Sequence, residues 1–276
     1  MGATLRIVTK QQIVTALAVA AAACLAACAR SQVDPHTLCS EEGPESTTAL
    51  ILDTSDPLAS HQIAALERFT ESLVKQTRRP DGSLQPSENY VAKGHLLVVY
   101  ELPRAGDPGG TPQEVFRMCN PGSPEDRGPV AGFTEGEVAV MVRWSHFTKA
   151  MRSAFPDSVT RSSAPTSPII ETLRYVRNRE FPGPVEIASS KRSGGAIIII
   201  SDLLQNTDLL SHYRGPLPPA KGLPQSLALN LSGIEIGVRY LRSQRDRHLQ
   251  TSEHFAWWRK FLAEAGGPMT RTPESW

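Results

Sequence analysis

The sequence predicts an α/β domain in which a doubly wound, mostly parallel sheet carries helices on both faces. Short apolar segments typical of buried strands alternate along the chain with segments whose apolar residues recur at helical spacing. This alternation favours parallel strands joined by helices. One segment, residues 196–201, contains consecutive isoleucines with no polar residue between them, as expected for a parallel strand covered on both faces.

The composition excludes several classes of protein. Hydrophobic residues make up 40 % of the chain, which is enough for a core and argues against extended disorder. Lys and Arg number 29 against 28 Asp and Glu, so the chain lacks the basic surface of a nucleic-acid-binding protein. The 22 prolines and 20 glycines predict long irregular connections.

The N-terminus has the features of an export signal. Arg6 and Lys10 precede an apolar run over residues 13–27. This run gives about 22 Å of helix, short of the roughly 30 Å hydrocarbon core of a membrane, and so suits a signal sequence better than a permanent span.

The run ends in Leu25-Ala26-Ala27-Cys28, which resembles the lipobox of bacterial lipoproteins. That resemblance implies a signal peptide over residues 1–27 and acylation of Cys28, with palmitate among the expected lipids. The protein would then be held at the cell membrane or the outer membrane, facing the periplasm. Ala29 follows the cysteine where an aspartate would indicate inner-membrane retention, which favours the outer membrane. A plain secretory signal containing a cysteine and an uncleaved anchor are the alternatives.

The remaining cysteines are expected to pair. Cys24 leaves with the signal peptide and Cys28 carries lipid, so Cys39 and Cys119 remain. Two thiols in an oxidising compartment commonly form a disulfide. Two separate free thiols are the alternative. No Cys-x-x-Cys spacing occurs, which argues against structural zinc.

Residues 28–46 are polar and are expected to form a tether that precedes the domain. The domain is expected over residues 47–266, followed by a C-terminal tail over residues 267–276. Its buried strands are predicted at residues 48–52, 95–102, 196–201 and 234–241. Residues 103–132 and 215–224 are rich in Gly and Pro without periodicity and are expected to be long surface loops.

Four helices are predicted between the strands. Residues 59–76 carry apolar side chains at helical spacing, and Thr134-x-x-Glu137 has the pattern of a capping box that opens a second helix. A third helix follows Ser167-Pro168, since proline suits the first helical turn. The last helix covers residues 252–265 and ends at Gly266-Gly267.

Polar side chains follow the predicted strands and form the candidate site. Asp53 and Ser55 come directly after the first strand, Thr166 precedes a helix, and Asp202 ends the isoleucine-rich strand. In an open α/β sheet, ligands bind outside the carboxyl ends of the strands. These hard oxygen ligands suit Mg²⁺, which takes one or two carboxylates and keeps several waters.

On these residues the chain resembles the von Willebrand factor type A (VWA) family over residues 47–266. The resemblance implies a metal-ion-dependent adhesion site (MIDAS) made by Asp53, Ser55, Thr166 and Asp202. Pro57 stands where the family has a second serine, so the motif is degenerate and one direct oxygen ligand is missing. Asp56 could compensate. In the alternative interpretation these residues only cap helices: Asp56-Pro57 and Thr166 or Ser167 would start helices, and Ser201-Asp202 would form a turn.

The expected function is that of a lipid-anchored cell-envelope module that binds a protein partner through a weak or degenerate Mg²⁺ site. The alternative is an Mg²⁺-dependent phosphatase or phosphotransferase of the haloacid-dehalogenase type, with Asp53 as nucleophile. In that chemistry a second aspartate two residues on acts as acid and base, and Ser55 stands there instead. The binding module is therefore the favoured hypothesis.

Overall fold

The structure is a computed structural model that describes residues 33–103, 110–126, 136–160, 164–183, 195–269 and 274–276. The expected signal peptide, the lipidation site Cys28, residues 28–32 of the expected tether and the expected capping residue Thr134 lie outside these ranges. None of the described helices combines the length and the apolar character needed to cross a bilayer.

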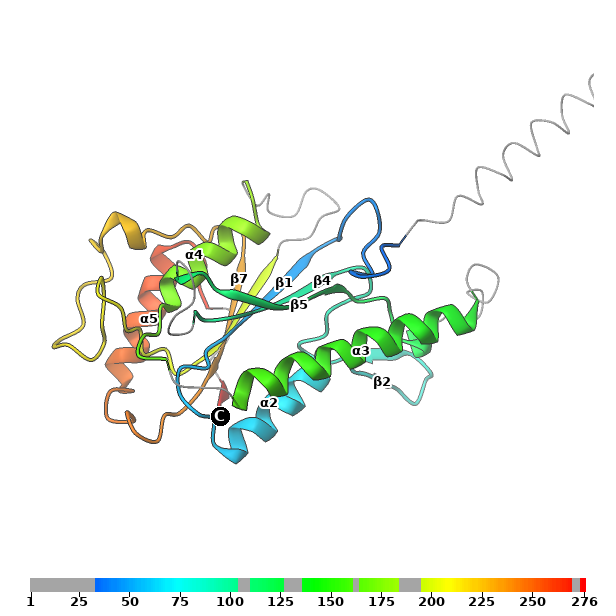
Figure 1. The fold of residues 1–276 in the computed structure, drawn as a ribbon, viewed down its shortest axis with the longest axis horizontal. Helices are drawn as coiled ribbons and strands as arrows, with labels where there is room; N and C mark the ends of the chain where they lie inside the picture. The colour runs from blue at the N-terminus through cyan, green and yellow to red at the C-terminus, as the bar shows by residue number, and fades with distance from the viewer. Residues whose placement is uncertain (1–32, 104–109, 127–135, 161–163, 184–194, 270–273) are drawn as a thin grey trace, which may run out of the picture.

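A six-stranded sheet of order β5-β4-β1-β6-β7-β8 forms the centre of the molecule (Figure 1). The four predicted strands are confirmed as β1, β4, β6 and β7, and all of them run parallel. Their bounds are Thr47–Leu52, Leu96–Glu101, Ala196–Ser201 and Glu235–Tyr240.

Helices cover both faces of this sheet, as the sequence predicted. Helices α2 (Ser60–Ser72) and α3 (Glu137–Thr160) lie together on one face, and α4 (Ile169–Glu180) and α5 (Ser252–Glu264) belong to the other (Figure 1). Because side chains alternate along a strand, β1 and β4 supply residues to both cores. The arrangement is compatible with a Rossmann-like fold.

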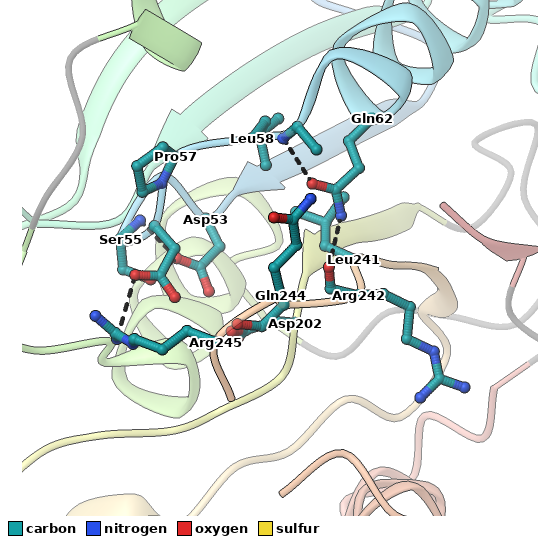
Figure 2. A pocket seen from close by; sticks show the side chains of 13 residues that line it. Asp53, Ser55, Pro57, Leu58, Gln62, Asp202, Leu241, Arg242, Gln244 and Arg245 are labelled. Atoms are coloured by element: carbon teal, nitrogen blue, oxygen red, sulfur yellow. Dashed lines mark hydrogen bonds and ion pairs between the residues drawn. The ribbon is translucent and has the colours of Figure 1, made fainter. Parts of the chain in front are cut away.

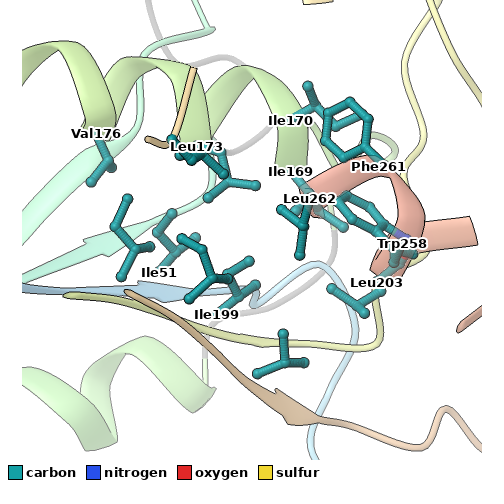
Figure 3. Packing of buried hydrophobic residues seen from close by; sticks show 14 of the residues in the cluster. Ile51, Ile169, Ile170, Leu173, Val176, Ile199, Leu203, Trp258, Phe261 and Leu262 are labelled. Atoms are coloured by element: carbon teal, nitrogen blue, oxygen red, sulfur yellow. The ribbon is translucent and has the colours of Figure 1, made fainter. Parts of the chain in front are cut away.

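The larger core lies under α4 and α5. Ile51 and Ile199 of the sheet belong to the same buried cluster as Leu173 of α4 and Trp258 of α5 (Figure 3). Burial of a side chain of this size stabilises the fold by about 1.5–3 kcal/mol. The indole Nε1 of Trp258 donates to the carbonyl oxygen of Leu203 at 2.7 Å, so this large side chain is buried without leaving its polar atom unpaired.

The prediction of a surface loop over residues 103–132 is wrong in part, because β5 (Gln113–Cys119) lies within it. This strand pairs antiparallel with β4 at the edge of the sheet. Only Phe116 and Cys119 of the strand are buried, and its polar residues face solvent or ion pairs. An edge strand of this kind shows neither a continuous apolar run nor a clear alternation, which is why the sequence pattern missed it.

The disulfide between Cys39 and Cys119 is confirmed, with an S–S distance of 2.06 Å and a sequence separation of 80. It joins the segment before β1 to the end of β5. The backbone N–H of Cys119 also donates to the carbonyl oxygen of Thr37 at 2.7 Å, and Leu38 is buried. The described part of the expected tether is therefore fixed to the domain.

The ends of the elements depart from expectation in small ways. Helix α2 ends at Ser72, and the following residues form a hairpin of β2 (Gln76–Arg78) and β3 (Leu84–Pro86). Helix α5 ends before Gly266, as predicted; the φ of this glycine is +84°, and a Cβ there would lie 2.5 Å from the hydroxyl of Ser232.

Three short elements complete the fold. Two are single 3₁₀ turns, η2 (Pro124–Asp126) and η4 (Gln225–Leu227). The third is β8 (Glu274–Ser275) in the expected C-terminal tail, which pairs with β7. Next to it, the ring of Trp276 lies 5.6 Å from that of Phe69 on α2. The end of the chain thus packs against the domain.

Candidate functional site

A pocket of about 390 Å³ opens at the carboxyl ends of β1, β6 and β7 (Figure 2). The chain passes from β1 to β4 and β5 on one side of the sheet and returns to β6 and β7 on the other. The pocket therefore lies at the switch point of the topology, where α/β sheets bind ligands. It is lined by Asp53, Ser55, Asp56, Pro57, Leu58, Ala59, Gln62, Asp202, Leu241, Arg242, Ser243, Gln244 and Arg245.

Asp53 follows β1 and is held by three serine side chains. One carboxylate oxygen, Oδ1, accepts hydrogen bonds from the backbone N–H of Ser55 at 3.0 Å and from its hydroxyl at 2.6 Å. The other, Oδ2, accepts from the hydroxyl of Ser201 at 2.7 Å and from that of Ser167 at 3.1 Å. Asp53 is only 4 % exposed, so these bonds fix its orientation in a mostly dry environment.

The loop before α4 presents Ser167 to this carboxylate, whereas Thr166 is exposed. Backbone hydrogen bonds in both directions between Ser167 and Asn206, at 2.9 and 3.0 Å, fix the rotation of the loop. The sequence therefore located the loop, but the side chain that reaches Asp53 is one residue further on. Ser167 and Ser201 were not among the predicted site residues, although both stand next to predicted ones.

Asp202 follows β6 and faces the same pocket (Figure 2). Its burial raises the pKa of the carboxyl group well above the ordinary value, and the negative charge of Asp53 raises that pKa further. A hydrogen bond from the backbone N–H of Leu204 to Oδ1, at 2.8 Å, acts in the opposite direction. A protonated or cation-paired Asp202 is the arrangement that this environment favours.

The segment after β6 contains Leu203 in a strained backbone conformation, which is held by contacts with β6 and α5. Leu203 is buried with a φ of +60°, a left-handed conformation that costs a non-glycine residue about 1–3 kcal/mol. Its N–H donates to the hydroxyl of Ser201 at 2.8 Å, and its carbonyl accepts from Trp258. Ser201 is the last residue of β6, so the expected turn at Ser201-Asp202 is not formed, and Asp202 directly after the strand lies against the pocket.

The helix-capping interpretation is wrong for the two helices. The N-cap residue of α2 is Ala59, and its backbone N–H donates to the side chain of Gln62 at 2.9 Å. The N-cap residue of α4 is Pro168, and no side-chain hydrogen bond caps that helix. Neither Asp56 nor Ser167 is therefore used as a helix cap.

Arg245 places a positive charge at the mouth of the acidic pocket. Its guanidinium Nη2 lies 3.4 Å from Oδ1 of Asp56, and its Nε lies 2.9 Å from Oδ2 of Asp246. Burial raises the pKa of Asp56, and the charge of Arg245 lowers it in part. The side chain of Arg245 is 72 % exposed, so these ion pairs contribute little to stability, and Arg245 is free to be displaced.

The donor atoms of the pocket fit Mg²⁺ in kind, and Asp53 and Asp202 supply the one or two carboxylates that this ion takes. Carboxylate and hydroxyl oxygens are the ligands that Mg²⁺ prefers. Within the described ranges, however, no group of three or more His, Cys, Asp or Glu residues could hold a metal ion. A metal here would depend on serine hydroxyls and water in addition to Asp53 and Asp202.

Comparisons with known proteins leave the family of this chain open. No protein-family model matches the chain, and no curated protein matches it. One solved structure with some likeness is proximal thread matrix protein 1 from the mussel byssus, at 11 % identity and a TM-score of 0.37. The alignment covers 81 % of this chain and 48 % of that one, so the chain spans about half the length of the mussel protein. A likeness of this degree supports no statement about function.

Proposed function

We propose that this protein is a lipid-anchored cell-envelope module with a VWA-like domain, which binds a protein partner at the pocket on the carboxyl edge of the sheet. The observation that carries the proposal is the carboxylate of Asp53, held by three serine hydroxyls beside the buried Asp202. A purely structural aspartate would not need a second buried carboxylate next to it. The repulsion between the two acids is relieved when a cation binds.

Mg²⁺ is the proposed cation, held by Asp53, Ser55 and Asp202. The hydroxyls of Ser55 and Ser167 donate hydrogen bonds to the carboxylate of Asp53. The lone pairs of the two hydroxyl oxygens therefore remain available to a cation. Bound Mg²⁺ would offer an open position to a carboxylate of the partner. Arg245 would then orient that partner at the rim of the pocket.

The metal site is expected to be weak, because Pro57 lines the pocket without offering a side-chain oxygen. Metal binding stabilises the native state by RT ln(1 + [L]/Kd), which is about 0.4 kcal/mol at a concentration equal to Kd. Pro57→Ser should increase this gain, and Asp202→Ala should abolish it. Thermal melts of the three proteins in Mg²⁺ and in EDTA measure the effect. A Pro57→Ser variant without any metal response would remove Mg²⁺ from the proposal.

The position of Thr166 offers a matched control for the site. Ser167→Ala removes a hydroxyl that touches Asp53, whereas Thr166→Ala removes an exposed one. Loss of the Mg²⁺ response or of partner capture should follow the first substitution and not the second. Equal effects would contradict the role given to Ser167.

The lipid anchor is tested independently of the pocket. Wild-type protein expressed in a bacterial host should take up labelled palmitate, and Cys28→Ala should not. If the wild-type protein takes up no label, the lipoprotein assignment fails while the pocket keeps its proposed role.

The phosphotransferase alternative makes a different prediction for Asp53. If the protein is a binding module, it should not hydrolyse generic phosphate esters in the presence of Mg²⁺. In that case Asp53→Asn should reduce partner capture. The serine hydrogen bonds to both carboxylate oxygens of Asp53 favour a fixed ligand over an attacking nucleophile. Phosphatase activity that disappears in Asp53→Asn would reverse this ranking.

A further inference from the structure

Helix α3 begins with three apolar side chains that are exposed in the described part of the chain. Val138, Met141 and Val142 are 74 %, 52 % and 61 % exposed. Their spacing of three and four residues places them on one face of the helix. Further along the helix, Lys149 and Arg152 are exposed at positions that continue this face, eleven and fourteen residues after Val138. The exposed face of α3 thus presents apolar side chains in its first turns and two cations further along.

Val138, Met141 and Val142 are uncovered because they lie on the outer face of α3, whereas Val140 on the opposite side of the first turn is buried. A helix of 24 residues is about 36 Å long, whereas a strand of six residues such as β1 spans about 20 Å. One end of α3 therefore extends beyond the sheet (Figure 1). The buried residues Phe147, Met151 and Phe155 lie in the later turns, where the helix packs on the sheet.

The exposed end of α3 lies at the same end of the molecule as the start of the described chain (Figure 1). β5 ends at Cys119, which is paired with Leu96 at the start of β4 and is bridged to Cys39. The 3₁₀ turn η2 that follows contacts α3. At the other end of α3, the N–H of Ala164 donates to the carbonyl of Ser55 beside the pocket. The helix thus runs from the tether end of the domain to the pocket end.

The proposed lipid anchor is close to this end of the molecule in sequence. Cys28 stands five residues before Val33, the first described residue, so a fully extended chain between them spans at most about 18 Å. The disulfide at Cys39 fixes the chain to the domain shortly afterwards. A lipid on Cys28 would therefore hold the tether end of the domain against the bilayer.

We infer that the first turns of α3 rest on the membrane surface, with Val138, Met141 and Val142 in contact with lipid and Lys149 and Arg152 near anionic headgroups. This inference rests on the proposed lipid anchor. A single acyl chain binds a membrane only marginally, and a second contact made of apolar and cationic side chains strengthens such binding. The contact also orients the domain, because it fixes which face of α3 lies against the bilayer.

The experiment uses an environment-sensitive fluorophore on the acylated full-length protein. Met141→Cys places the probe in the apolar end of α3, and Leu209→Cys is the matched control. Both native side chains are 52 % exposed, and Leu209 lies in the loop after Asp202 on the pocket side. Because Cys39 and Cys119 are bridged and Cys28 is acylated, the introduced cysteine takes the label.

Vesicles of phosphatidylethanolamine and phosphatidylglycerol are added to each labelled protein. The probe at position 141 should shift its emission to shorter wavelength and be quenched by lipid-borne nitroxide, whereas the probe at 209 should do neither. Val142→Asp in the Met141→Cys background should reduce both signals, and Leu209→Asp in the same background should leave them unchanged.

Flotation of the vesicles separates this inference from the proposed anchor. Protein that floats with vesicles while the probe at 141 stays silent overturns the membrane contact of α3 and leaves the anchor standing. Protein that neither floats nor responds overturns both. A response at 141 that depends on protein concentration without vesicles would show a second copy on this face, and it would also overturn the inference.

Discussion

Two buried histidines should make the stability of this domain fall steeply in mild acid. His212, in the loop after β6, and His254, on α5, are 4 % and 2 % exposed. Nδ1 of His212 lies 3.0 Å from Nε2 of His254. The same Nε2 lies 3.0 Å from the carbonyl oxygen of Leu203, and Nδ1 of His254 lies 3.2 Å from the hydroxyl of Tyr240.

This geometry assigns the protons of the pair. The carbonyl of Leu203 is an acceptor only, so Nε2 of His254 carries the proton and points it between that carbonyl and Nδ1 of His212. Nδ1 of His254 then accepts from the hydroxyl of Tyr240. Both rings are neutral in this arrangement, and burial disfavours protonation of either ring.

Burial lowers the pKa of His212 to about 3 and that of His254 to about 4, and the charge of His254 further disfavours protonation of His212. A histidine whose pKa is lower in the folded state contributes its full stability above its ordinary pKa of 6.5, and this stability is lost as the pH falls below that value. At pH 5 the loss is about 2 kcal/mol for each histidine, at 1.36 kcal/mol per pH unit. Together the pair removes about 4 kcal/mol between pH 7 and pH 5.

Asp202 acts with the opposite sign in the same range. Its raised pKa means that the folded state binds a proton more readily than the unfolded chain, so this group adds stability as the pH falls from 7 toward 4. A comparison between variants therefore isolates the histidines better than the wild-type curve alone.

Urea unfolding at pH 7 and pH 5 measures the effect. The double variant His212→Gln with His254→Gln has no titrating ring at these positions, and it should lose about 4 kcal/mol less than the wild type between the two pH values. His146→Gln is the control, because this histidine is exposed on α3. If the wild type and the double variant lose the same free energy, the histidine pair is not the acid-sensitive element and the proton assignment is wrong.

Three further predictions concern stability and are checked by urea unfolding at pH 7. The Cys39–Cys119 bridge closes a loop of 80 residues, so Cys119→Ala should cost about 4–5 kcal/mol; a cost below 1 kcal/mol would mean that the unfolded chain gains little freedom from the loss of the bridge. Glu180 is 4 % exposed and accepts from Arg117, so Glu180→Gln should cost about 2 kcal/mol, and a neutral result would show that this ion pair is not needed to hold β5. Phe147 is fully buried, so Phe147→Ala should cost about 3–5 kcal/mol, and a smaller loss would indicate that the core collapses onto the space.

The central strands could be predicted from the sequence because their surroundings are uniform. β1, β4 and β6 are covered on both faces and are apolar at nearly every position, whereas β7 alternates apolar residues with Glu235, Gly237 and Arg239. The helices could be predicted for a related reason, since each must present one apolar stripe to the sheet. The disulfide also followed from the sequence, because few cysteines remain to pair once the expected signal peptide is removed.

The edge of the sheet could not be predicted in this way. β5 has one neighbouring strand and a partly exposed face, so its sequence Gln113–Cys119 mixes charged and apolar residues without a clear period. The two-residue β8 is too short to carry any pattern. Both strands form because they pair with a neighbouring strand of the sheet: β5 pairs with β4, and β8 pairs with β7.

The convergence of Asp53, Ser55 and Asp202 on one pocket could be predicted from the sequence, because side chains that follow parallel strands meet at one edge of the sheet. The contact of Ser167 rather than Thr166 with Asp53 depends on tertiary contacts of the loop. Residue types do not show which of two adjacent hydroxyl side chains in a loop points inward. Here the backbone hydrogen bonds between Ser167 and Asn206 fix that orientation. The apolar end of α3 also depends on tertiary structure: Val138 and Met141 resemble core residues in the sequence, and the packing of the opposite face of the helix against the domain leaves them exposed.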